Sequence, residues 1–180
     1  MREIRWHGRA GQGAKTASLL YARAMMQSGA WVQAFPEYGP ERSGAPMRAY
    51  TRVDDRPVRR RYGITEPDTV VVLDPSLLKD ADPTAGLAPD GLLLVNSELE
   101  LPTPHPGRTL WIPATRLSPG AHVNVVMLGA LAAALGAPTL DDLRAAATEL
   151  FSKKKAAALE SAVQEIEAGY AAAAEVRWAA

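Results

Sequence analysis

The stretch EIRWHGRAGQGAKTASLLYARAMMQSG, residues 3–29, decides how the fold begins. Its first part, EIRWHG, predicts a short strand that ends at Gly8, and the apolar side chains that follow recur at helical spacing up to a stop at Gly29. Gly11 and Gly13 fall between the two elements. A glycine loop in this position can hold a phosphate, because backbone N–H groups approach the ligand closely and the helix N-terminus favours negative charge.

Two further stretches predict the neighbouring strands. Residues 31–35, WVQAF, follow the helix, and this order of strand, helix and strand favours a right-handed crossover and a parallel pair. Residues 47–53, MRAYTRV, alternate in side-chain character, which indicates a strand with one wet face. We expect residues 58–62 to return as its hairpin partner, so the predicted sheet is mixed.

The second half of the chain contains continuous apolar runs and then helical patterns. The runs that predict strands are residues 69–74, 91–96 and 109–114. The run at 69–74 has the composition of a strand covered on both faces. The stretches that predict helices are residues 122–135, residues 140–151 with Thr139 as N-cap, and residues 155–174 with a candidate break near Gly169.

Composition narrows the class of protein. The chain has 180 residues, of which 47% are hydrophobic, enough for one domain with a buried core. Its net charge is zero, which disfavours a nucleic-acid partner, and its longest nearly apolar run is shorter than the roughly 20 residues of a membrane span. Because it has no cysteine, it contains no disulfide, thiol nucleophile or cysteine-ligated iron–sulfur cluster, which suits a cytoplasmic protein.

The glycine loop leaves several ligands open. Its spacing, Gly8-x-x-Gly11-x-Gly13, reverses that of the dinucleotide fingerprint, although Glu37 lies where a ribose-binding acid would sit. Gly8 and Gly13 have the separation found in a P-loop, but the inserted Ala14 turns the following lysine by about 100° around the helix. NAD or FAD, a nucleoside triphosphate, a phosphate of another kind, or tight packing without a ligand all remain open.

A second loop adds charged and aromatic side chains at the same sheet edge. Residues 33–46, QAFPEYGPERSGAP, contain Glu37, Tyr38, Glu41 and Arg42. The loop follows the second strand, so we expect it beside the glycine loop, at the edge where ligands of open α/β sheets bind. An arginine there can pair with a phosphate.

Several stretches together resemble one family. They are WHGRAGQGAKTAS at 6–18, VQAFPEYGPERSGAPMRAYTRV at 32–53, EPDTVVVLDPSLL at 66–78, NVVMLGALA at 124–132 and, more weakly, IEAGY at 166–170. In this order they resemble the gamma subunit of the 2-oxoacid:acceptor (pyruvate:ferredoxin-type) oxidoreductases. Ala10 departs from the pattern, because the family usually has a second consecutive glycine there; an alanine is tolerated if its φ is negative.

The resemblance implies a fold and an assembly. It implies a Rossmann-like three-layer α/β/α domain over residues 1–180, with a mixed, mostly parallel sheet and a helical C-terminal part. It implies a non-catalytic subunit of an enzyme that converts a 2-oxoacid and coenzyme A to acyl-CoA and carbon dioxide and passes electrons to ferredoxin or another acceptor. The implied partners are alpha, beta and ferredoxin-like delta subunits, which hold thiamine diphosphate, Mg²⁺ and [4Fe-4S] clusters.

The resemblance also implies which residues bind. They would contact the coenzyme A phosphates from the glycine loop and the second loop: Gly8, Arg9, Gly11, Gln12, Gly13, Tyr38, Gly39, Arg42 and Ser43. No catalytic residue and no metal ligand is expected in this chain. The alternative is a free-standing dinucleotide- or nucleotide-binding protein, which would be stable and bind its nucleotide alone.

Four polar residues elsewhere have two interpretations each. His7, His105 and His122 have no metal-ligand partner at helical or strand spacing, so we expect solvated or capping roles for them. Asn124, near the start of its helix, either caps the helix or bonds to a ligand or partner. The helix itself has little polar surface, which fits a core helix or a subunit interface.

Overall fold

Six strands form one mixed sheet in the computed structural model, which describes residues 1–37, 44–80, 82–152 and 156–175. The strands are β1 (Arg2–Arg9), β2 (Trp31–Glu37), β3 (Pro46–Asp54), β4 (Thr69–Val72), β5 (Leu92–Asn96) and β6 (Arg108–Ile112), in the spatial order β2-β3-β1-β4-β5-β6. The helices are α1 (Ala14–Gln27), α2 (Leu77–Asp80), α3 (Val123–Leu135), α4 (Leu140–Leu150) and α5 (Ala156–Ala174). This confirms the mixed, mostly parallel α/β fold.

The order of the first three strands differs from the expectation. β1 and β2 point the same way, but β3 lies between them and is antiparallel to both, so the parallel pair is not adjacent. Residues 58–62 form no strand, because both edges of β3 are already occupied. The buried guanidinium of Arg5 instead ties this connection to β1, donating to the carbonyls of Ile64 and Thr65 at 3.2 and 3.3 Å.

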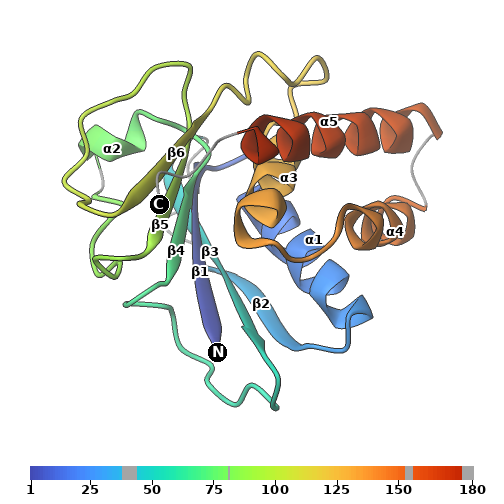
Figure 1. Cartoon of the computed structure of the whole chain (residues 1–180), viewed down its shortest axis with the longest axis horizontal. Helices are drawn as coiled ribbons and strands as arrows, with labels where there is room; N and C mark the ends of the chain where they lie inside the picture. Colours follow the sequence, from blue (N-terminus) through green and yellow to red (C-terminus); the bar gives the residue numbers. More distant parts are fainter. Residues whose placement is uncertain (38–43, 81, 153–155, 176–180) are drawn as a thin grey trace.

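Helices cover the two faces of the sheet unequally. Figure 1 shows α1, α3, α4 and α5 on one face, and α2 with connecting loops on the other. β4 is buried on both faces, as expected: Val71 belongs to the large core under the four helices, whereas Val70 and Val72 pack with Leu77 in a smaller core. Burying each such side chain contributes roughly 1.5–3 kcal/mol.

Close backbone contact joins α3 to α5. A Cβ added at Gly169 would lie 1.9 Å from the carbonyl oxygen of Val126, and one at Gly129 would lie 2.0 Å from that of Ile166. Gly169 therefore does not break α5, which continues through it to Ala174. Because residues 124–132 are all buried, α3 is a core helix of this domain.

The start of α4 confirms the predicted cap. The amide of Asp142 donates to the hydroxyl of Thr139 at 3.2 Å, and the amide of Thr139 donates to the carboxylate of Asp142 at 3.0 Å. These reciprocal bonds satisfy two amides at the helix start. Within the described ranges, no helix combines the length and the apolar character needed to cross a membrane.

Candidate functional site

The glycine loop connects the end of β1 to the start of α1. Gly11 and Gly13 have φ of 97° and 81°, a region that favours glycine. Gly13 also has no room for a side chain, because an added Cβ would lie 2.6 Å from Nδ2 of Asn124. Ala10 keeps a negative φ and donates its amide to the carbonyl of Ala45 at 2.9 Å, so the departure from the family pattern is tolerated.

The helix behind this loop has no acidic residue in its first turn. Gly13 is the N-cap of α1, offers no side-chain cap, and accepts the amide of Ala17 at 3.0 Å. The positive end of the helix dipole is therefore directed at the loop without neutralisation by a carboxylate of the first turn.

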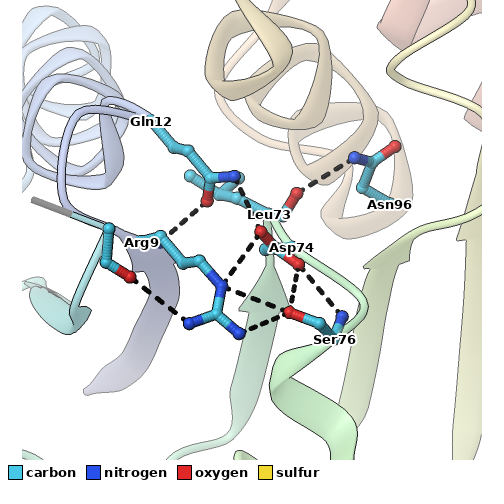
Figure 2. A network of polar contacts seen from close by, with 7 residues as sticks. Arg9, Gln12, Leu73, Asp74, Ser76 and Asn96 are labelled. Carbon is cyan, nitrogen blue, oxygen red and sulfur yellow. Dashed lines mark hydrogen bonds and ion pairs between the residues drawn. The ribbon is translucent and has the colours of Figure 1, made fainter.

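The side chain of Gln12 folds back to brace the loop, as Figure 2 shows. Its Oε1 accepts the amide of Arg9 at 2.7 Å, and its Nε2 donates to Oδ2 of Asp74 at 2.9 Å. Arg9 Nε lies 3.3 Å from the same carboxylate oxygen. The glycine loop is thus fixed to the segment that follows β4.

Asp74 and Ser76 form the centre of this network (Figure 2). The amide and hydroxyl of Ser76 donate to Oδ1 of Asp74 at 3.0 and 2.6 Å, and Nη2 of Arg9 donates to the Ser76 hydroxyl at 2.6 Å. Burial would raise the pKa of Asp74, but hydrogen bonds from Ser76 and Gln12, together with the charge of Arg9, hold it below its ordinary value. Asp74 is therefore ionised at neutral pH.

The network continues along the carboxyl edge of the sheet. Nδ2 of Asn96, at the end of β5, donates to the carbonyl of Leu73 and to the hydroxyl of Thr115, both at 3.0 Å. Figure 2 shows Asn96 next to Leu73. The ends of β1, β4, β5 and β6 are thus linked by side chains. Sequence reasoning missed Ser76, Asn96 and Thr115, since isolated polar residues after strands carry no distinctive spacing.

A hollow of about 290 Å³ lies beside the glycine loop, between the N-terminal ends of α1 and α3 and one side of α5. We call it the α1–α3 hollow; it is lined by Gly11, Gln12, Gly13, Thr16, Ala121, His122, Asn124, Val125, Phe151, Ala158 and Ala162. Asn124 belongs to this lining, and its Nδ2 donates to the carbonyl of Gly13 at 3.3 Å. The lining combines a polar loop with an apolar wall.

The structure brings the predicted glycine-loop residues together and places the second loop's flanks beside them. Arg9 Nη1 donates to the carbonyl of Gly44 at 3.3 Å, and Glu37 ends β2 at the same edge. The described flanks of the second loop therefore lie at the same sheet edge as the glycine loop. The remaining predicted residues, Tyr38, Gly39, Arg42 and Ser43, lie outside the described residues, as does Glu41. The carboxylate of Glu37 accepts the Tyr50 hydroxyl and lies 3.9 Å from Nη1 of Arg48.

Two of the three histidines are buried, so the expectation of a solvated role is wrong for them. His7 lies on a covered sheet face, where its Nε2 accepts Arg5 Nε at 3.0 Å. Burial and the nearby charges of Arg5 and Arg48 lower the pKa of His7 to about 3, so the ring is neutral. His105 is also buried, with Nε2 2.9 Å from a backbone carbonyl. His122 stays half exposed, although it pairs with Glu165.

These features define an α/β domain with its candidate site at the carboxyl edge of the sheet, where ligands of such sheets bind. The model of the pyruvate ferredoxin/flavodoxin oxidoreductase family matches residues 3–172. The chain is 46% identical over 176 residues to the pyruvate/ketoisovalerate oxidoreductases common subunit gamma of Thermococcus kodakarensis, covering 90% of this chain and 95% of that protein.

Solved structures show the same fold. The crystal structure of pyruvate oxidoreductase subunit PORC from Thermotoga maritima matches with a TM-score of 0.84 and 37% identity, over 95% of this chain and 96% of that chain. 2-Oxoglutarate:ferredoxin oxidoreductase from Magnetococcus marinus, solved with 2-oxoglutarate, coenzyme A and succinyl-CoA bound, matches with a TM-score of 0.84 over 99% of this chain and 32% of that chain. At 18% identity, that second likeness shows the fold alone.

The chain belongs to the pyruvate ferredoxin/flavodoxin oxidoreductase family. Within it, the chain is a gamma-type subunit of an oxidoreductase complex, which confirms the resemblance carried by the two loops.

Proposed function

We propose that this chain is the gamma subunit of a thiamine-diphosphate-dependent 2-oxoacid:ferredoxin or acceptor oxidoreductase and that it supplies a coenzyme A-binding surface. The reaction converts a 2-oxoacid and coenzyme A to acyl-CoA and carbon dioxide, and it transfers the electrons released to the acceptor. The observation that carries the proposal is the glycine loop, which points an uncapped helix N-terminus at the carboxyl edge of the sheet.

Two loops would share the binding of the coenzyme A phosphates. The glycine loop offers backbone N–H groups around Gly11 and Gly13, held in shape by Gln12 and Arg9. The second loop offers Tyr38, Gly39, Arg42 and Ser43. Because the guanidinium of Arg9 is engaged by Asp74 and Ser76, Arg9 orders the loop, and Arg42 is the better candidate for direct phosphate contact.

The chemistry itself would take place in partner chains. Thiamine diphosphate would supply the carbanion chemistry of decarboxylation, and [4Fe-4S] clusters would carry the electrons onward. Both would belong to alpha, beta and ferredoxin-like delta subunits in the cytoplasm. This chain has no cysteine with which to ligate a cluster, and it would contribute binding and assembly contacts only.

The test is a kinetic comparison in the assembled complex. Arg42→Ala is expected to raise the KM for coenzyme A by roughly 10- to 150-fold, because a hydrogen bond to a charged group contributes roughly 1.5–3 kcal/mol. Subunit assembly should not change. Arg61→Ala is the matched control, since Arg61 is an exposed arginine outside both loops. An unchanged KM in the Arg42 variant, or full coenzyme A dependence in a complex that lacks this chain, would contradict the proposal.

A further inference from the structure

A buried carboxylate on α5 holds the segment that leads into α3. Glu165 is 2% exposed, and its Oε1 accepts the hydroxyl of Ser118 at 2.8 Å and the amide of Gly120 at 3.0 Å. Its Oε2 lies 3.0 Å from Nδ1 of His122. Each of these hydrogen bonds goes to residues 118–122, so Glu165 fixes the entry to α3.

This arrangement sets the direction of the His122 ring. With Nδ1 bound to Glu165, the remaining ring nitrogen, Nε2, has no partner among the described residues. The side chain is 52% exposed and lines the α1–α3 hollow. Gly120 permits the approach, because an added Cβ would lie 2.8 Å from Nδ1 of His122. A buried carboxylate behind a ring that faces a hollow is an arrangement that orients histidines toward ligands.

The rest of the hollow suits a ligand with an anionic group and an apolar part. The glycine loop and the N-terminal ends of α1 and α3 meet here. The first turn of α1 lacks an acidic residue, whereas Glu165 already occupies the entry to α3, so the end of α1 is the one open to an anionic group. Asn124 is 8% exposed, and its Oδ1 has no partner among the described residues although Nδ2 bonds to Gly13. Val125 and Phe151 contribute the apolar wall.

We propose that His122 is a further ligand-binding residue of the glycine-loop site, and that it contacts the diphosphate of coenzyme A in the α1–α3 hollow. The inference rests on the proposed function, since it names additional residues of the same site. In the proposed contact Nε2 donates to a phosphate oxygen while Nδ1 donates to Glu165. Glu165 is a positioning residue that touches no ligand, and the apolar wall covers the part of the molecule next to the diphosphate.

The experiment uses the assembled complex and two readouts. Initial rates of 2-oxoacid-dependent acceptor reduction give the KM for coenzyme A, and ADP serves as a competitor that carries the diphosphate without the pantetheine arm. His122→Ala is expected to raise both the KM for coenzyme A and the inhibition constant of ADP about tenfold, while kcat is retained. His122→Gln provides a second variant with a polar side chain and should show the same effects.

The positioning role has its own matched pair. Glu165→Gln is expected to raise the KM for coenzyme A and the inhibition constant of ADP, because a neutral amide at position 165 holds the His122 ring less strongly than the carboxylate does. Glu160→Gln, an exposed change on the same helix, should leave them unchanged. A uniform fall in kcat without a change in either constant would show that Glu165 only supports the fold, and would overturn its positioning role.

A glycine-loop variant distinguishes a failure of the His122 assignment from a failure of the proposed coenzyme A site. If Gln12→Ala raises the KM for coenzyme A and neither His122 variant does, the glycine-loop site stands and the role of His122 is wrong. If neither Gln12→Ala nor the His122 variants change that KM, both ideas are wrong. If ADP does not compete with coenzyme A in the wild-type complex, the diphosphate assignment is wrong.

Discussion

Gly13→Ala is expected to lower the free energy of unfolding by more than the cost of a left-handed backbone conformation, because the new side chain also displaces Asn124. The φ of 81° lies in the left-handed region, where a side chain costs about 1–2 kcal/mol. The added Cβ would also lie 2.6 Å from Nδ2 of Asn124, so this 8% exposed amide must move and lose its bond to the Gly13 carbonyl. That loss adds about 0.5–1.5 kcal/mol, giving roughly 1.5–3.5 kcal/mol in all.

Gly29→Ala is a closely matched control. Gly29 has a φ of 83°, and a Cβ added there meets no atom within 4 Å. It should therefore show the conformational cost of about 1–2 kcal/mol without the contact. The assay is urea unfolding of the purified chain, followed by circular dichroism, with free energies of unfolding extrapolated to water.

Comparing the two glycine variants tests whether the contact with Asn124 matters for stability. If Gly13→Ala and Gly29→Ala lower the free energy of unfolding equally, the contact with Asn124 has no energetic weight. A second check is Asn124→Ala in the Gly13→Ala background, which should be less harmful than Asn124→Ala alone because the overlap has been removed. Additive effects of the two changes would also refute the reading.

Three other changes test the fold and the network. Gly169→Ala should destabilise by about 1–3 kcal/mol or more, since its Cβ would lie 1.9 Å from the Val126 carbonyl oxygen; a variant with an unchanged thermal midpoint would contradict the close α3–α5 contact. Thr139→Ala should cost about 1 kcal/mol in urea unfolding by removing the cap that Asp142 shares, and no loss would show that α4 does not depend on it. The folded pKa of Asp74 lies below its unfolded value, so the stabilisation from its ionised carboxylate is present above about pH 4 and is lost as the pH falls through the folded pKa. Asp74→Asn should therefore flatten the dependence of the free energy of unfolding on pH in this range. A pH dependence identical to that of the wild type would argue against the network.

The regular elements could be predicted because their signals are local. The ranges 122–135 and 140–151 differ by one residue from α3 (Val123–Leu135) and α4 (Leu140–Leu150), and Thr139 caps α4 as its sequence context indicates. Helical periodicity and capping depend on residues within a few positions of each other. The order of β1, β2 and β3 could not be read this way, because strand pairing joins distant segments.

The candidate site also has features that local sequence signals predict and features that depend on contacts between distant segments. The sequence by itself determined the glycine loop after β1, the second loop after β2 and the lack of cysteine ligands. Only the tertiary structure decided that Arg9 meets Ser76, 67 positions away, and that Glu165 reaches His122 across 43 positions. Such contacts depend on how whole strands and helices pack, and packing brings together polar side chains whose spacing in the chain carries no signal.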